Sequence, residues 1–176
     1  STQNDMVTLG SRIIDSIKQR DALPPMPKVS QEIIQLTHEP YAESSMLIEI
    51  VKQDPALSMQ IIHYANSPLH APLDPITSID RAVVVLGFDF VVNLALGFSI
   101  GKELKMPNQG VMGRDQFWKH ALATAALTKA LIETIHYSRR PPSGFGYLAG
   151  LLHNIGLLYL GHKFPKLYSK VMVAYD

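Results

Sequence analysis

The stretch Gly150-Leu-Leu-His-Asn-Ile-Gly156 places an imidazole and a carboxamide side by side inside an apolar segment. Leucine and tyrosine residues between Tyr147 and Leu160 continue the pattern of a helix with one buried face. A buried polar group without a partner costs about 1–3 kcal/mol. We therefore expect His153 and Asn154 to be hydrogen-bonded, metal-bound or functional, and the other helices to be organised around them.

A second histidine, His120, lies on another apolar segment, which is predicted to be a helix from Phe117 to His136. If the two helices pack face to face, the imidazoles of His120 and His153 come together. Trp118 lies two residues before His120, so it points to a different face of the same helix, into the junction between two lobes.

The composition indicates a globular domain with balanced charge. The chain has 176 residues, of which 47% are hydrophobic and 18% are charged, and its formal net charge is +1. This balance argues against nucleic acid as the main partner, because nucleic-acid-binding proteins usually show a basic patch. The chain contains no cysteine, and no signal peptide pattern is found at its start. We expect a cytoplasmic location.

One segment, Ala82 to Ile100, is a nearly unbroken apolar run. Gly87, Asp89 and Asn93 interrupt it, and an Asp at the centre of a membrane helix costs about 2.5–3.5 kcal/mol. The run is interpreted as one helix that ends at Gly87 and another that begins at Asp89, and no membrane span is expected.

Apolar residues at helical spacing predict helices along the whole chain, and no alternating strand pattern is found. Helices are expected at about 6–20, 28–37, from 44 or 45 through 51, 55–66, 78–87, 89–104, 117–136, around 147–160, and from 165 to the end. Loops are expected at 23–27, 68–75, 107–113 and 138–146, the last being the best candidate for a mobile segment.

Several residues are predicted to begin or end these helices. Asp54 before Pro55 is a strong start signal, and Asn66 is expected to satisfy backbone groups where that helix ends. The other predicted N-caps are Ser44 or Ser45, Thr77 with Asp80 in a capping box, Asp89 and Asp115.

The predicted fold is therefore all-α: a compact helical bundle of two lobes in a single domain. The helical N-terminal lobe is expected over about 1–106 and the second lobe over about 114–176, joined near Pro107. The last helix has no stop signal before Asp176, so the domain is expected to extend past this point.

Six motifs in a fixed order carry a family resemblance. They are Leu23-Pro-Pro-Met-Pro27, Asp54-Pro-Ala-Leu-Ser58, Tyr64-Ala-Asn-Ser-Pro68, the segment from Ser78 to Gly87, Phe117-Trp-Lys-His120, and Gly150 to Gly156. In this order they resemble the HDOD family, the HD-related output domains of bacterial signalling proteins. The resemblance implies a second lobe similar to HD-type metal-dependent phosphohydrolases.

The resemblance also implies where metal ligands would lie. In active HD relatives the ligands are a histidine, a later His-Asp pair and a distal aspartate. The matching positions here are His120 and the pair His153-Asn154, and the only later aspartate is Asp176 at the chain end. Asn154 offers a neutral carbonyl oxygen where a divalent metal would need a charged ligand. We therefore expect no cofactor or, at most, a weak site for Mn, Fe, Mg or Ni.

The favoured functional prediction is a non-catalytic signalling output or interaction domain. Its expected partners are receiver, cyclic-dinucleotide or kinase domains, and it could also form a homo-oligomer. Two alternatives remain open: a metal-dependent phosphohydrolase that acts on a nucleotide or cyclic dinucleotide, and a nucleotide-binding sensor without turnover. In the favoured interpretation His120, His153 and Asn154 form a buried polar cluster that keeps the helices in register.

Overall fold

The computed structural model describes residues 2–18, 24–108 and 110–173. Helices and their connections make up these ranges, and no strand occurs in them, so the all-α prediction is confirmed. The helices are α1 (Thr2–Lys18), α2 (Lys28–Thr37), α3 (Ser44–Lys52), α4 (Pro55–Ala65), α5 (Ile79–Leu86), α6 (Phe88–Glu103), α7 (Arg114–Glu133), the 3-10 helix η2 (Tyr137–Arg139), α8 (Ser143–Leu152), α9 (Ile155–Lys163) and α10 (Pro165–Val173). The predicted ends of the first and last helices, Arg20 and Asp176, lie outside the described residues.

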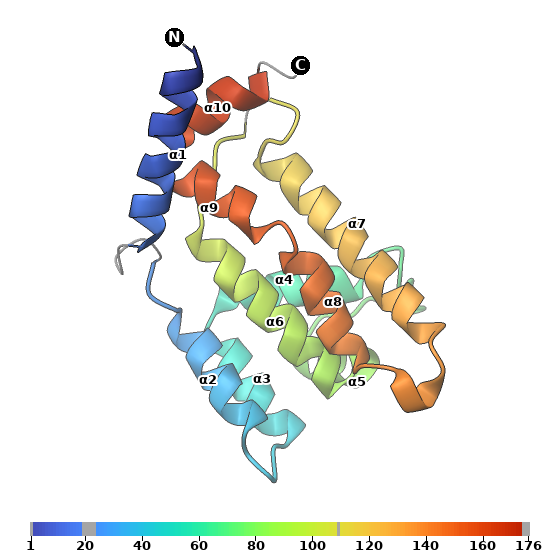
Figure 1. Cartoon of the computed structure of the whole chain (residues 1–176). Helices are drawn as coiled ribbons and strands as arrows, with labels where there is room; N and C mark the ends of the chain where they lie inside the picture. The colour runs from blue at the N-terminus through green and yellow to red at the C-terminus, as the bar shows by residue number, and fades with distance from the viewer. Residues whose placement is uncertain (1, 19–23, 109, 174–176) are drawn as a thin grey trace.

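Helix α6 is the centre of the bundle (Figure 1), and helices α2, α3, α4, α5 and α8 pack around it. Its apolar residues face several directions, and Val91, Leu94 and Ala95 are fully buried. A helix that is apolar all round needs neighbours on every side. The surrounding helices satisfy this need, which explains the long apolar run in the sequence.

None of the described helices is by itself long and apolar enough to cross a membrane. Helices α5 and α6 reach the necessary length only together, and the chain bends by 117° between them. The bend lies at Gly87, whose φ of 88° is in the left-handed region that favours glycine. The predicted break at Gly87 is thereby confirmed.

Two of the predicted caps are confirmed by hydrogen bonds. The Asp54 carboxylate accepts from the Leu57 amide at 3.1 Å, at the start of α4. After the same helix, the Asn66 side chain donates to the carbonyls of Ile62 and Ile76 and accepts from the Ile76 amide. Asn66 therefore ties the end of α4 to the segment before α5.

The other predicted caps are wrong. Helix α5 is capped by Ser78, whose hydroxyl accepts from the Arg81 amide at 3.2 Å, and not by Thr77. Neither Ser44 nor Ser45 caps α3, whose N-cap is Glu43. Asp89 and Asp115 each lie in the first turn of a helix, where a negative charge interacts favourably with the helix dipole.

The predicted loop at 138–146 is also partly wrong, because α8 begins at Ser143. The two glycines in this region had indicated a mobile loop. In the structure they allow close packing: a Cβ on Gly144 would lie 2.7 Å from the carbonyl oxygen of Asp89, and a Cβ on Gly146 would clash with Ile132. A glycine that avoids a clash and a glycine in a loop are indistinguishable in a single sequence.

The connection between α6 and α7 is held to the C-terminal helices by two hydrogen bonds. The Tyr168 hydroxyl of α10 donates to the Met112 carbonyl at 2.7 Å, and the Lys105 amide donates to His162 Nδ1 at 3.0 Å. Helix α8 packs against both α6 and α7. The division into lobes at about 1–106 and 114–176 stays a prediction.

Candidate functional site

The candidate site depends on the close packing of α7 against α8. Ala121 and Ala125 of α7 are fully buried, and Gly150 of α8 lies against them. A Cβ on Gly150 would stand 2.7 Å from the Cα of Ala125 and 2.8 Å from the Thr128 hydroxyl. Only glycine lets the two backbones approach this closely.

This packing brings the two predicted histidines together. The Nε2 atoms of His120 and His153 lie 3.3 Å apart, and the ring centroids are separated by 5.2 Å. His120 projects from α7, and His153 is the residue that follows α8. The sequence prediction that two packed helices would join these imidazoles agrees with this geometry.

A hydrogen bond assigns the tautomer of His153. Its Nδ1 lies 2.7 Å from the Gly150 carbonyl oxygen, which can only accept, so Nδ1 carries the proton. In the neutral ring, Nε2 of His153 is then a lone-pair acceptor, which accepts from His120 when His120 carries its proton on Nε2. When His120 carries its proton on Nδ1 instead, the Nε2 lone pairs of His120 and His153 point into the same space.

The expectation of a buried polar cluster is wrong for the two histidines, because both side chains are exposed. The physical reason is that the helix is interrupted at this point. The sequence pattern suggested one continuous helix through the motif, but α8 ends at Leu152 and α9 begins at Ile155. His153 therefore lies at a helix end on the surface.

Asn154 does not join the pair through a hydrogen bond. It occupies the N-cap position of α9, its carbonyl accepts from the Leu157 amide at 2.9 Å, and its side chain makes no capping bond. Its carboxamide has no hydrogen-bond partner among the described residues. It is free to turn towards a ligand or solvent.

The spacing of the histidine pair is compatible with two ligands of a metal ion. Two nitrogens 3.3 Å apart, each about 2.1 Å from a shared ion, would subtend an angle of about 104° at it, close to tetrahedral. The Nδ1–H of His153 on a backbone carbonyl is also a typical outer contact of a metal-binding histidine. However, no group of three or more His, Asp or Glu side chains placed to hold an ion occurs in the described part of the chain. These residues do not fit the two-ion centre of a phosphohydrolase.

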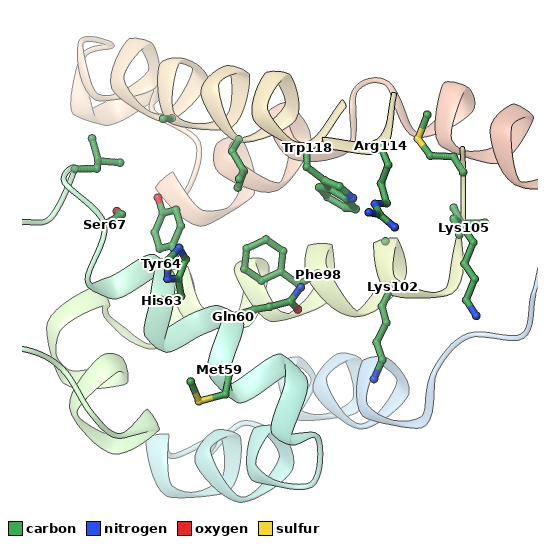
Figure 2. Close-up of a pocket in the computed structure, with 16 residues that line it drawn as sticks. Met59, Gln60, His63, Tyr64, Ser67, Phe98, Lys102, Lys105, Arg114 and Trp118 are labelled. Atoms are coloured by element: carbon green, nitrogen blue, oxygen red, sulfur yellow. The ribbon is translucent and has the colours of Figure 1, made fainter. Parts of the chain in front are cut away.

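A second feature, which the sequence did not predict as a site, lies on the other face of α7. A cleft of about 900 Å³ separates α7 from α4 and α6 (Figure 2). Trp118 lines this cleft. The one tryptophan of the chain was the only sequence signal for it.

A cluster of aromatic rings borders the cleft. Tyr64 lines it and packs against His70, Phe90 and Tyr147, with ring centroids 5.1, 5.7 and 5.5 Å away. The Tyr64 and Tyr147 hydroxyls lie close enough to influence each other's pKa, but not in the geometry of a hydrogen bond. Burial raises the pKa of both phenols, so both stay protonated. Burial, aided by the charge of Lys129, lowers the pKa of His70, so its ring is neutral near pH 7.

The chain is similar to three known proteins along most of its length. The first is an uncharacterized protein of Treponema pallidum (strain Nichols), 24% identical over 169 residues, of which this chain spans 31%. The second is a protein of Marinobacter aquaeolei VT8 assigned to signal transduction, whose crystal structure is similar to this one with a TM-score of 0.70 and 38% sequence identity. The match covers 86% of this chain and 34% of that chain. The third is an HDOD domain protein of Geobacter sulfurreducens of unknown function, with 28% identity and a TM-score of 0.70 over 96% of this chain and 54% of that one.

The chain thus spans between about a third and about a half of the length of these relatives. The HDOD domain model matches residues 23–176, nearly the whole chain and the same region that carries the six ordered motifs. Together with the shared helical fold, this match shows that the chain belongs to the HDOD family, a family of signalling domains.

Proposed function

We propose that this domain is a non-catalytic signalling module that works by binding other protein domains. The observation that carries the proposal is the ligand set at the HD-type positions. His120 and His153 converge within 3.3 Å, but the residue next to His153 is Asn154, and no carboxylate completes a metal group among the described residues.

The missing charge is decisive for catalysis. Hydrolysis of a phosphoester by two metal ions needs anionic ligands that hold both ions 3.5–4 Å apart and offset their charge. Two neutral imidazoles and a carboxamide supply no negative charge. Such a site would hold one divalent ion weakly, and it would lack a bridging carboxylate to position a second ion.

The surface around the end of α7 offers a place for partner binding. Leu127 and Leu131 lie one turn apart on α7 and are exposed, and Phe145 near the start of α8 is exposed as well. Exposed apolar patches are typical of interaction sites, and we propose that these side chains contribute to one. The partners we propose are receiver, cyclic-dinucleotide or kinase domains of signalling proteins, or a second copy of this domain.

The test compares the purified chain with the variant Asn154→Asp. The metal content of each protein is measured after incubation with manganese or iron, followed by an assay of phosphodiester hydrolysis with a cyclic dinucleotide. We expect substoichiometric metal and no turnover for the natural sequence. One or two equivalents of metal together with turnover would establish the alternative, a metal-dependent phosphohydrolase.

A further inference from the structure

The cleft between α4, α6 and α7 has the charge and shape of a small-molecule site, and it lies on the opposite face of α7 from the histidine pair. Its volume of about 900 Å³ falls within the range of 300–1,000 Å³ that is typical of ligand pockets. Three basic residues line the cleft, Lys102, Lys105 and Arg114. No acidic side chain is found among the described residues that line it. In a chain with sixteen basic and fifteen acidic residues, this is a marked separation of charge.

Two of these cations already have a partner. The Lys102 ammonium lies 2.8 Å from Asp54 Oδ2, outside the cleft wall, so its charge is largely offset. Arg114 contacts Asp115 through Nε at 3.3 Å, which leaves its two Nη groups without a partner among the described side chains. The Lys105 ammonium forms no ion pair with a described residue. Arg114 and Lys105 are therefore the groups that can receive an anion.

The walls of the cleft are aromatic. Trp118 and Arg114 enter from α7 side by side, and Phe98 faces them from α6 (Figure 2). Gly101 of α6 makes room for the indole ring, because a Cβ at that position would clash with Trp118. An aromatic ring can therefore pack on Phe98 and Trp118, while Arg114 stays within reach of a negative group.

The end of the cleft near α4 holds unused polar groups. The hydroxyls of Tyr64 and Ser67 both line the cleft, are buried, and have no hydrogen-bond partner in the described part of the protein. Tyr64 is 9% exposed. Buried polar groups are nearly always hydrogen-bonded, so a ligand that moves the side chains covering these two oxygens would find partners for a polar group of its own.

We propose that this cleft binds a small organic anion with an aromatic body. The body lies between Phe98 and Trp118, the anionic group contacts Arg114 and Lys105, and the far end reaches the hydroxyls of Tyr64 and Ser67. A ligand bound here contacts α4, α6 and α7 at once, so it would couple its own concentration to the relative position of these helices. The site is independent of His120, His153 and Asn154.

The single tryptophan makes the test direct, because the fluorescence of Trp118 reports the cleft alone. The probe is anilinonaphthalene sulfonate, an aromatic anion, and the matched uncharged compound is N-phenylnaphthylamine. We expect the sulfonate to quench Trp118 with saturation at one molecule per chain, and the uncharged compound to bind at least about tenfold more weakly. Equal binding of both compounds would overturn the proposal, since it would indicate an apolar groove for a protein segment.

Variants at Arg114 and Lys105, with a control at Arg139, assign the anion partner. Arg114→Gln keeps most of the side chain but removes the charge, and it should weaken sulfonate binding by at least about tenfold, the equivalent of about 1.4 kcal/mol. Arg139→Gln, beyond the other end of α7, is the matched control and should bind like the natural sequence. Unchanged melting temperatures establish that both variants are folded. If Arg114→Gln and Lys105→Gln both bind the sulfonate as tightly as the natural sequence, the assignment is wrong.

Competition distinguishes two anionic groups, a phosphate and a carboxylate. Adenosine monophosphate offers an aromatic base with a phosphate, and phenylbutyrate offers a ring with a carboxylate; uncharged adenosine is the control. Displacement of the sulfonate by one of these anions, but not by adenosine, supports the proposal and identifies the head group. If neither anion competes at concentrations on the order of 1 mM, the proposal fails. This failure leaves the non-catalytic function intact, because that function is tested by metal content and turnover.

Discussion

At the residue scale, the proposed lack of catalysis rests on Asn154. It follows His153 in the chain, the Nε2 atom of His153 lies 3.3 Å from that of His120, and its side chain differs from that of an aspartate by one amide group. A carboxylate is acceptor-only and negatively charged, whereas a carboxamide is neutral and also donates. The number of charged ligands is one of the properties that set the affinity of a site for a divalent cation.

We predict that Asn154→Asp raises the affinity of the chain for Mn²⁺ by at least about tenfold, which is about 1.4 kcal/mol. The added charge is the cause, so the neutral variant Asn154→Ser should show no gain. Calorimetric titration of each protein measures the affinity. Equal binding by the aspartate and serine variants would mean that the pair His120 and His153 cannot orient a third ligand at this position.

Residue types alone predicted His120 and His153 as a pair, but they did not predict its environment. Burial depends on where the helix ends, and the apolar residues on both sides of His153 gave no signal of the break between Leu152 and Ile155. The cleft was missed for a similar reason. Its lining residues come from α4, α6 and α7, which are far apart in sequence, so no local pattern joins them.

At the element scale, helix existence was predicted well and helix ends less well. Helix α2 has its predicted bounds, Lys28–Thr37, because apolar periodicity and the flanking prolines agree there. At α5, Thr77 and Ser78 are both suitable N-caps, and the sequence alone does not show which of the two adjacent residues caps the helix. Packing decides such cases, since burial of Ile79 and Val83 fixes the register of the helix.

The start of α4 allows a prediction with a defined pH dependence. Burial opposes the ionised form of Asp54, but the hydrogen bonds from Lys102 and from the Leu57 amide outweigh it and lower the pKa below its ordinary value of 3.8. Asp54→Asn keeps an N-cap but loses the ion pair, so at pH 7 we expect a loss of up to about 1 kcal/mol. Asp54→Ala also loses the cap and should cost about 1 kcal/mol more.

The direction of the pH dependence of stability follows from the lowered pKa of Asp54. The charge of Asp54 stabilises the fold above its unfolded pKa, and this stabilisation is lost as the pH falls through the lower folded pKa. Urea unfolding at a series of pH values should therefore show the natural chain and Asp54→Asn converging below about pH 3.8. A constant difference down to the most acidic pH would contradict the role of the charge.

The contact between α7 and α8 gives the clearest test of element packing. Gly150→Ala should lower the free energy of unfolding by about 1–3 kcal/mol, although alanine favours a helix by about 1 kcal/mol over glycine. The new Cβ would meet the backbone of Ala125, which cannot move away cheaply.

Gly156→Ala in α9 is the matched control for this substitution, because nothing lies within 4 Å of its added Cβ. Gly156→Ala should leave the free energy of unfolding unchanged or raise it by up to about 1 kcal/mol. Chemical denaturation of the two variants measures both effects. Equal behaviour of the two would show that α7 and α8 do not pack as closely as Gly150 indicates.

On the scale of the whole molecule, one buried cluster extends from Val29 of α2 to Tyr168 of α10. None of the described side chains of helix α1 belongs to it. None of the described side chains of α1 is buried, and Val7 and Ile14 are 66% and 52% exposed. The HDOD match also begins after this helix, at residue 23.

Removal of residues 1–22 should therefore leave the melting temperature within about 2 °C of the intact chain, because for a domain of this size about 1 kcal/mol corresponds to 2–4 °C. The comparison is removal of residues 165–176, which takes away the buried Tyr168 and its hydrogen bond to the Met112 carbonyl. That shorter deletion should lower the melting temperature by several times as much, through the loss of an apolar contact and of the hold on the 107–113 connection. Thermal unfolding followed by circular dichroism at one protein concentration measures both. A larger effect from the N-terminal deletion would place α1 in the cooperative core and contradict this prediction.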